Sequence, residues 1–219
     1  MDIKSEIDRG RDLHQQGKLD EARAIYETVL AYHPENDEVL SLMGLVALQS
    51  GQGETAVEFL NQAIQQNNGI AKYYSNLAIA LLALGDIDGA HAQVSKAVEI
   101  DGNFVDALYN LGNIEAQRGE RAAAAQTYRR VIELAADHVD AKSNLATMLR
   151  LAGDREEAVA LTRQALALRP DDHRLMFNLA TLLAETGETA ECKRLLEQVV
   201  TVPELRTAAE AFKAKMEAN

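Results

Sequence analysis

Four asparagines with a regular spacing are the residues of this chain whose chemistry most needs an explanation. They stand in helix-like stretches such as "YNLG" and "FNLA" and recur every 34 residues, at Asn76, Asn110, Asn144 and Asn178. Asn is roughly 0.5 kcal/mol less favourable than Ala inside a helix, because its side chain competes with the backbone for hydrogen bonds. An amide also carries both a donor and an acceptor. The spacing therefore indicates a hydrogen-bonding role.

No other residues have the spacing of a catalytic or metal-binding motif. The stretch "GQGETA" at 51–56 matches a dinucleotide-binding loop on paper, but it follows a predicted helix where such a site needs a strand. The stretch "QGKLD" around Lys18 lacks the upstream Gly of a phosphate loop. The histidines never form an i, i+4 pair or a HExxH helix, at His14, His33, His91, His138 and His173. We expect no enzyme, no cofactor and no metal.

The interval of 34 residues extends over nearly the whole chain. A glycine recurs with this period, at Gly17, Gly51, Gly85, Gly119, Gly153 and Gly187. Five residues after each glycine comes a small residue, at Ala22, Ala56, Ala90, Ala124, Ala158 and Cys192. Cys192 takes the place that Ala holds in the other units, so we expect a buried thiol and no nucleophile. Six units fill residues 3–206, with boundaries at 3–36, 37–70, 71–104, 105–138, 139–172 and 173–206.

Each unit has the pattern of two helices joined at the recurrent glycine. Apolar residues precede it at helical spacing, as in Leu108, Leu111 and Ile114, and Gly ends a helix at little conformational cost. The small residues lie where the two helices must approach closely. One such hairpin cannot bury its apolar face alone. Neighbouring units are therefore expected to stack into an all-α solenoid of antiparallel helix pairs.

Composition agrees with a helical protein and excludes several kinds of partner. The 219 residues are 47% apolar and only 5% aromatic, with three Pro. The net charge of −12 argues against binding nucleic acid, which needs clustered Lys and Arg. No apolar run reaches the 18 or so residues of a membrane span, and "MDIKSEIDRG" has no apolar core like that of a signal peptide. With a single Cys, the simplest location is the cytoplasm.

The repeated unit resembles the tetratricopeptide repeat (TPR) family. The pattern is Leu with Gly or Ala, then the turn Gly, then the small residue, and four residues later a larger residue at Tyr26, Leu60, Val94, Tyr128, Thr162 and Leu196, with Pro following in some units at Pro34 and Pro170. This resemblance implies a right-handed superhelical solenoid. It also implies that the first helix of each unit lines a concave inner surface.

In other members of the family, Asn at this position binds the backbone of an extended peptide. The resemblance therefore implies that the four asparagines are peptide clamps, with Asp8 and Leu42 at the matching positions of the first two units. Nearby side chains predicted to share the peptide-binding groove are Lys72, Tyr109, Asn113, Thr147, Arg150, Arg174 and Phe177. The asparagines lie two residues before a small residue and so off the predicted buried stripe. Two other interpretations remain: they bond a neighbouring helix, or they are inherited from duplication of one repeat. Tyr109 and Phe177 are either apolar anchors or part of the packing between helices.

Both ends of the array have the pattern of terminal elements. Glu6 and Arg9 replace the apolar residues of the second unit, and Pro203 begins a capping helix at 203–219 with Leu205, Ala208, Phe212 and Met216 on one face. We expect a free-standing scaffold that binds a protein or peptide partner. One alternative is a self-assembling homo-oligomer, suggested by Leu42 and Leu45 in the groove. Another is an accessory module that recruits substrates to a partner enzyme, as Asn-lined arrays do in the resembling protein glycosyltransferases.

Overall fold

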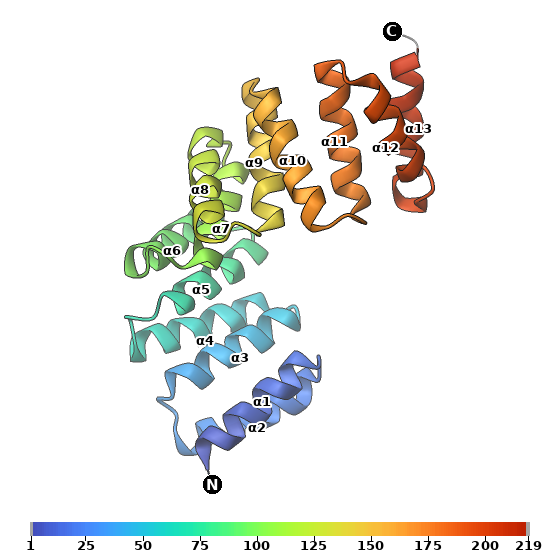
Figure 1. Ribbon diagram of the computed structural model, residues 1–219. Coiled ribbons are helices and arrows are strands. Elements are labelled where there is room, and N and C mark those ends of the chain that lie inside the picture. The colour runs from blue at the N-terminus through green and yellow to red at the C-terminus, as the bar shows by residue number, and fades with distance from the viewer. Residues whose placement is uncertain (1, 218–219) are drawn as a thin grey trace. The chain divides into compact units, whose positions relative to one another are not determined.

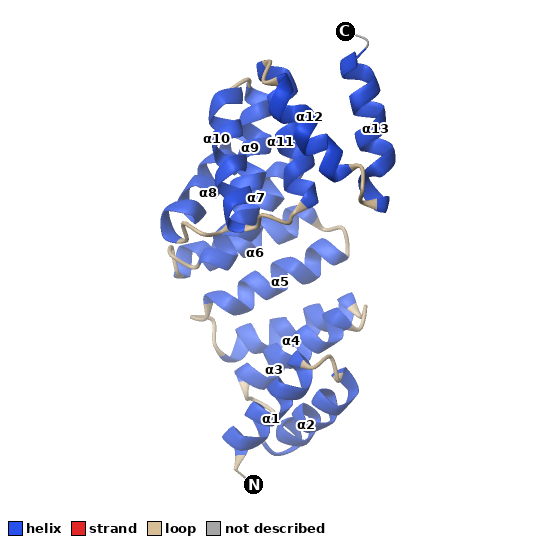
Figure 2. Ribbon diagram, turned by 45° about the vertical axis from the view of Figure 1, so that its right-hand side comes forward, coloured by secondary structure: helices blue, strands red, loops and turns tan. Residues whose placement is uncertain are grey.

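A computed structural model describes residues 2–217, and every regular element in that range is an α-helix (Figures 1 and 2). The all-α expectation is confirmed. The helices fall into two compact units, residues 1–118 (unit 1) and 119–219 (unit 2).

Unit 1 consists of seven helices within its described residues. They are α1 (Ile3–Gln15), α2 (Leu19–Tyr32), α3 (Asp37–Gln49), α4 (Gly53–Gln66), α5 (Ala71–Ala83), α6 (Ile87–Ile100) and α7 (Val105–Gln117). The first six form antiparallel pairs, and each second helix packs on the first helix of the next pair (Figure 1). In addition α1 packs on α3, α3 on α5 and α5 on α7. These four helices form one surface, which we call the first-helix face of unit 1.

Unit 2 consists of six helices among the residues described. They are α8 (Arg121–Leu134), α9 (Val139–Ala152), α10 (Arg155–Leu168), α11 (His173–Thr186), α12 (Thr189–Val199) and α13 (Pro203–Glu217). The helix α13 packs against α11 and α12, as expected for the C-terminal helix. Residues 218–219 of the predicted cap lie outside the described residues.

Each recurrent glycine follows the end of a helix and has a left-handed backbone conformation. All six have a positive φ, between 74° and 99°. After this glycine the chain closes a local turn: the Lys18 N–H donates to the Leu13 carbonyl over 2.9 Å, and the Gln52 N–H donates to the Ala47 carbonyl over 2.8 Å. This is the pattern in which a C-terminal Gly satisfies carbonyls that the helix leaves unpaired. It turns the chain back for the second helix.

Small residues allow the helices of a pair to approach closely. A Cβ atom at Gly10 would lie 2.4 Å from Cε1 of Tyr26, and one at Gly44 would lie 2.6 Å from Cγ of Leu60. Both distances are far below van der Waals contact, so glycine at these positions is what admits the large buried side chain of the second helix.

The face of α13 that contacts unit 2 differs by one residue from the prediction. Ala209 is buried while Ala208 is exposed. Both lie about one helical turn from Leu205 and from Phe212, so the packing on α11 and α12, and not the helical period, decides which of them is buried. The ring of Phe212 packs edge-on against Phe177 of α11, with centroids 6.1 Å apart. Phe177 therefore belongs to the packing between helices.

Candidate functional site

The asparagines of unit 1 bond the first helix of the preceding pair. The Nδ2 of Asn76 on α5 donates to Oγ of Ser41 on α3 over 3.4 Å. One repeat later, Nδ2 of Asn110 on α7 donates to Oγ of Ser75 on α5 over 3.2 Å. Among residues 2–217 neither amide oxygen accepts a hydrogen bond, so each keeps an acceptor for a ligand.

This arrangement corrects one part of the sequence interpretation. The asparagines were expected to lie off the buried stripe, which is wrong for Asn76, since it is only 8% exposed. Asn110 is half-buried. Adjacent first helices are close enough that a short Ser side chain leaves room for the amide beside it. The bond to a neighbouring helix, which the sequence left as an alternative to peptide binding, exists for Asn76 and Asn110, and it fixes the orientation of both amides.

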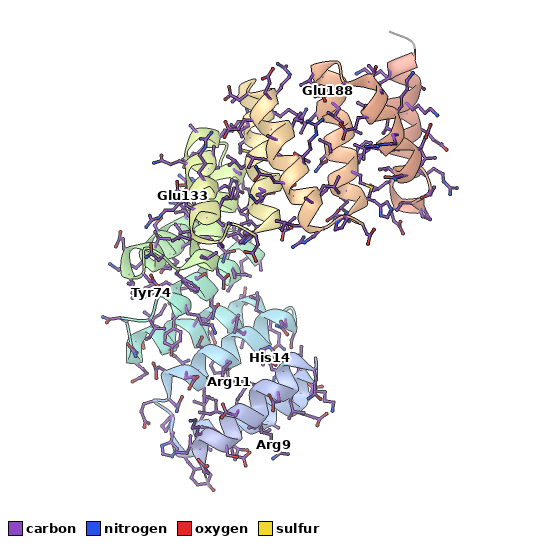
Figure 3. The ribbon with its side chains drawn as sticks, viewed as in Figure 1. Arg9, Arg11, His14, Tyr74, Glu133 and Glu188 are labelled. Carbon is purple, nitrogen blue, oxygen red and sulfur yellow. The ribbon has the colours of Figure 1, made fainter. Side chains whose placement is uncertain are left out.

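Two pockets open on the first-helix face of unit 1. Their volumes are about 430 Å³ and about 200 Å³, and both are lined by Arg11, Leu42 and Lys72. The larger one also has His14, Gln15, Gly17 and Gln49 in its lining, whereas the smaller one has Glu38, Ser41, Leu45, Ile70 and Tyr73. Arg11 and His14 lie on the side of α1 that faces α3 (Figure 3). Ser41 accepts the bond from Asn76 and lines the smaller pocket, so this pocket lies beside the amide.

The charges around these pockets differ in how far they are already paired. Arg11 is paired with Asp8 over 2.9 Å and also with Glu38. Lys72 is exposed and has no hydrogen bond or ion pair to any residue between 2 and 217. Of the Lys and Arg side chains that line these two pockets, it is therefore the one that remains unpaired within the described residues.

Two tyrosines of unit 1 have a raised pKa. The Tyr73 hydroxyl donates to Oδ2 of Asp37 over 3.0 Å, and burial together with this carboxylate raises the pKa of Tyr73. Burial raises the pKa of Tyr26 to about 12. Tyr73 lines the smaller pocket as an uncharged side chain near neutral pH, whereas Tyr26 lies on α2, outside the first-helix face.

In unit 2 the two remaining asparagines differ from each other. Nδ2 of Asn144 on α9 donates to the hydroxyl of Tyr128 on α8 over 3.3 Å. Asn178 on α11 is exposed, and it has no side-chain hydrogen bond in the described part of the chain. Each unit thus holds two of the four predicted clamps, and those of unit 1 share one kind of partner.

The other predicted site residues have varied surroundings. In unit 1, Tyr109 and Asn113 are half-buried on α7. In unit 2, Oγ1 of Thr147 donates to the carbonyl of Ser143 over 3.1 Å, and Arg150 pairs with Glu185 over 3.1 Å. Arg174 is exposed on α11. Phe177 packs on α13 and Arg150 pairs with Glu185. The apolar ring and the positive charge that the sequence predicted for a peptide-binding groove are therefore already engaged within the protein.

The site contains residues that the sequence interpretation missed. Ser41 and Ser75 position the amides, while Ile70 and Tyr73 line the smaller pocket. A signal for the serines exists in the sequence, because Ser also recurs with the 34-residue period, at Ser41, Ser75 and Ser143. No such period marks Ile70, which lies at the N-terminus of α5.

The described residues contain no group of three or more His, Cys, Asp or Glu side chains placed to hold a metal ion. None of the described helices combines the length and apolarity that crossing a membrane requires.

Models of one protein family match most of the chain. Two family models described as tetratricopeptide repeat match residues 13–80 and 149–216, and residues 75–141, respectively. The BBSome complex member BBS4 of Xenopus tropicalis is 35% identical over 94 residues, which are 40% of this chain and 18% of that protein. A TPR repeat-containing protein of Synechococcus elongatus is 33% identical over 108 residues, 47% of this chain and 26% of that protein. The chain thus spans only about a fifth to a quarter of these relatives.

Solved structures share the fold at low sequence identity. Pseudomonas aeruginosa pilF has a TM-score of 0.89 with 15% identity, covering 97% of both chains. YrrB, described as a TPR protein with an unusual peptide-binding site, has a TM-score of 0.72 with 15% identity, covering 86% of this chain and 97% of that one.

Proposed function

Because this chain belongs to the tetratricopeptide repeat family, we propose that it is a non-enzymatic scaffold that binds an extended segment of a partner protein on the first-helix face of unit 1. Proteins of this family generally mediate interactions between proteins. The peptide-binding site named for YrrB supports a peptide as the ligand class.

The amides of Asn76 and Asn110 supply the main-chain contacts in this proposal. Each donates its N–H to a serine, which leaves the amide oxygen to accept from a peptide N–H of the partner. A main-chain contact of this kind gives affinity without reading side chains. Because the serines already hold the amides in place, little side-chain entropy is lost when the partner binds.

The observation that carries the proposal is that Ser41 contacts both the Asn76 amide and the smaller pocket. It accepts from Asn76 and also lines the pocket of about 200 Å³. A segment whose backbone is bonded to Asn76 therefore has a pocket beside it for one of its side chains. Unit 2 by itself presents the exposed Asn178, with Arg174 one helical turn before it on α11.

Selection of peptides on the isolated protein tests this function. Random 12-residue peptides displayed on phage are selected against the wild-type chain, and the affinity of a selected peptide is measured for variants. Asn110→Ala removes one charge-neutral hydrogen bond to the peptide and is expected to weaken binding about five- to tenfold. Asn61→Ala, an exposed Asn on α4, is the matched control and should leave the affinity unchanged. Thermal unfolding verifies that both variants fold. Failure to select any peptide, or an Asn110→Ala variant with lower stability but unchanged affinity, contradicts the proposal.

Self-association is the second candidate function. It is favoured by Leu42 and Leu45, which are only half-buried on the first-helix face. Sedimentation at several concentrations separates the two functions, since a chain that stays monomeric throughout excludes self-assembly.

A further inference from the structure

We propose that the partner segment carries an apolar side chain that fills the pocket of about 200 Å³, next to an acidic residue that pairs with Lys72. This inference rests on the proposed function and specifies its ligand. The partner class is an extended peptide in which one acidic residue stands beside a Leu-sized apolar residue.

Leu42 gives the pocket an apolar side chain where the repeat elsewhere has an amide. Leu42 lies two repeats before Asn110 and one before Asn76, at the position of the clamps. Leu45, Ile70 and the ring of Tyr73 form the rest of the apolar part of the lining, and Ile70 is 36% exposed. The polar part consists of Arg11, Glu38, Ser41 and Lys72. An apolar cavity of about 150 Å³ holds a benzene molecule, so this pocket has room for one aliphatic or aromatic side chain.

Lys72 selects for an acidic neighbour. Arg11 is already neutralised by Asp8 and Glu38, whereas Lys72 has no partner among residues 2–217. The chain as a whole carries a net charge of −12 and repels acidic peptides. Despite this overall repulsion, an acidic residue of the partner is favoured at the one place where it meets Lys72. Such a local charge pair mainly fixes where the segment binds and adds less to how tightly it binds.

The three contacts lie close enough together for one short segment to make them. Lys72 and Asn76 are four residues apart on α5, so their side chains share one face of the helix about 6 Å apart. Lys72 lines the same pocket as Ser41, the partner of Asn76. A backbone bonded to Asn76 thus places one side chain in the pocket and a neighbouring residue beside Lys72.

The test uses the random 12-residue phage library, with the wild-type chain and four variants. Wild type should enrich peptides in which Leu, Ile, Met or Phe stands within two residues of Asp or Glu. Leu42→Asn should remove the apolar preference and weaken a selected peptide at least tenfold, whereas the control Leu84→Asn, an exposed Leu at the end of α5, should not. Lys72→Gln should remove the acidic preference and weaken binding two- to fivefold, whereas Lys96→Gln on α6, which removes an equal charge, should not.

Substitutions in the peptide test the same contacts without any change in the protein. Replacing the apolar residue of a selected peptide with Ala should weaken binding to wild type at least tenfold, and it should have little effect on binding to Leu42→Asn.

The outcomes separate this inference from the function on which it rests. If no peptide is selected, both fail. If peptides bind in an Asn110-dependent way but show no apolar and acidic preference, or keep it in Leu42→Asn, the inference is overturned and the proposed function stands. A concentration-dependent dimer of the wild type that Leu42→Asn abolishes also overturns it, since a second copy of the chain then fills the pocket.

Discussion

Replacing Tyr26 with Phe removes one buried hydroxyl group that has no hydrogen-bond partner within the described residues. The equivalent residue three repeats later, Tyr128, is buried to the same degree but accepts a bond from Asn144 over 3.3 Å. The residue that corresponds to Asn144 in the earlier repeat is Leu42, which has no donor. Two equivalent tyrosines therefore differ in one respect: the hydroxyl of Tyr128 is hydrogen-bonded, whereas that of Tyr26 is not, in the part of the chain that the structure describes.

The expected effects on stability have opposite signs. An unsatisfied buried polar group costs about 1–3 kcal/mol, whereas a hydrogen bond made within the protein contributes about 1 kcal/mol. We expect Tyr26→Phe to raise the free energy of unfolding by about 1 kcal/mol and Tyr128→Phe to lower it by about 1 kcal/mol. Since both rings are at most 1% exposed, their burial terms cancel in the comparison.

Circular dichroism during urea unfolding measures both effects, and unchanged m-values verify that the variants unfold as the wild type does. For a chain of this size, 1 kcal/mol corresponds to a shift in melting temperature of about 2–4 °C. Leu42→Asn supplies the missing donor, so it should stabilise the wild type but not the Tyr26→Phe variant. Equal destabilisation by Tyr26→Phe and Tyr128→Phe, or a Leu42→Asn effect independent of Tyr26, would refute the reasoning.

Three further predictions concern packing, pH and reactivity. Gly10→Ala should destabilise the chain by about 1–3 kcal/mol in thermal unfolding, because its Cβ would overlap the Tyr26 ring, whereas Gly69→Ala, whose Cβ would meet only a side-chain oxygen at 3.6 Å, should not. Burial raises the pKa of Tyr26 to about 12, above an unfolded value of about 10. Its contribution to stability is therefore complete below pH 10 and is lost as the pH rises to about 12, and Tyr26→Phe should flatten this decline in urea unfolding at several pH values. Burial also raises the pKa of the Cys192 thiol, whose Sγ lies 3.3 Å from Sδ of Met216. DTNB at pH 8 should react slowly with it in the wild type and faster in Met216→Ala, and equal rates would show that α13 does not shield it.

The hydrogen-bond partners of the four recurrent asparagines could not be predicted from the sequence. The 34-residue period identified the asparagines themselves, and a bond to a neighbouring helix was one of the interpretations that it left open. Their partners depend on a side chain 35 residues earlier for Asn76 and 16 residues earlier for Asn144. In unit 1, Asn76 donates to a serine on another first helix, whereas in unit 2 Asn144 donates to Tyr128 on the second helix α8. Periodicity alone does not reveal this difference between equivalent positions.

Local physics made the helices and turns of this protein predictable from its sequence. A turn such as the one at Gly17 depends on a few neighbouring residues, because a positive φ and the bond from Lys18 to Leu13 involve one stretch of backbone. The chemistry of the first-helix face depends instead on side chains from α1, α3 and α5. Whether Lys72 is free while Arg11 is paired follows from which carboxylates lie within reach of each. Only the tertiary structure decides this, because the distances between helices determine which charges are already neutralised.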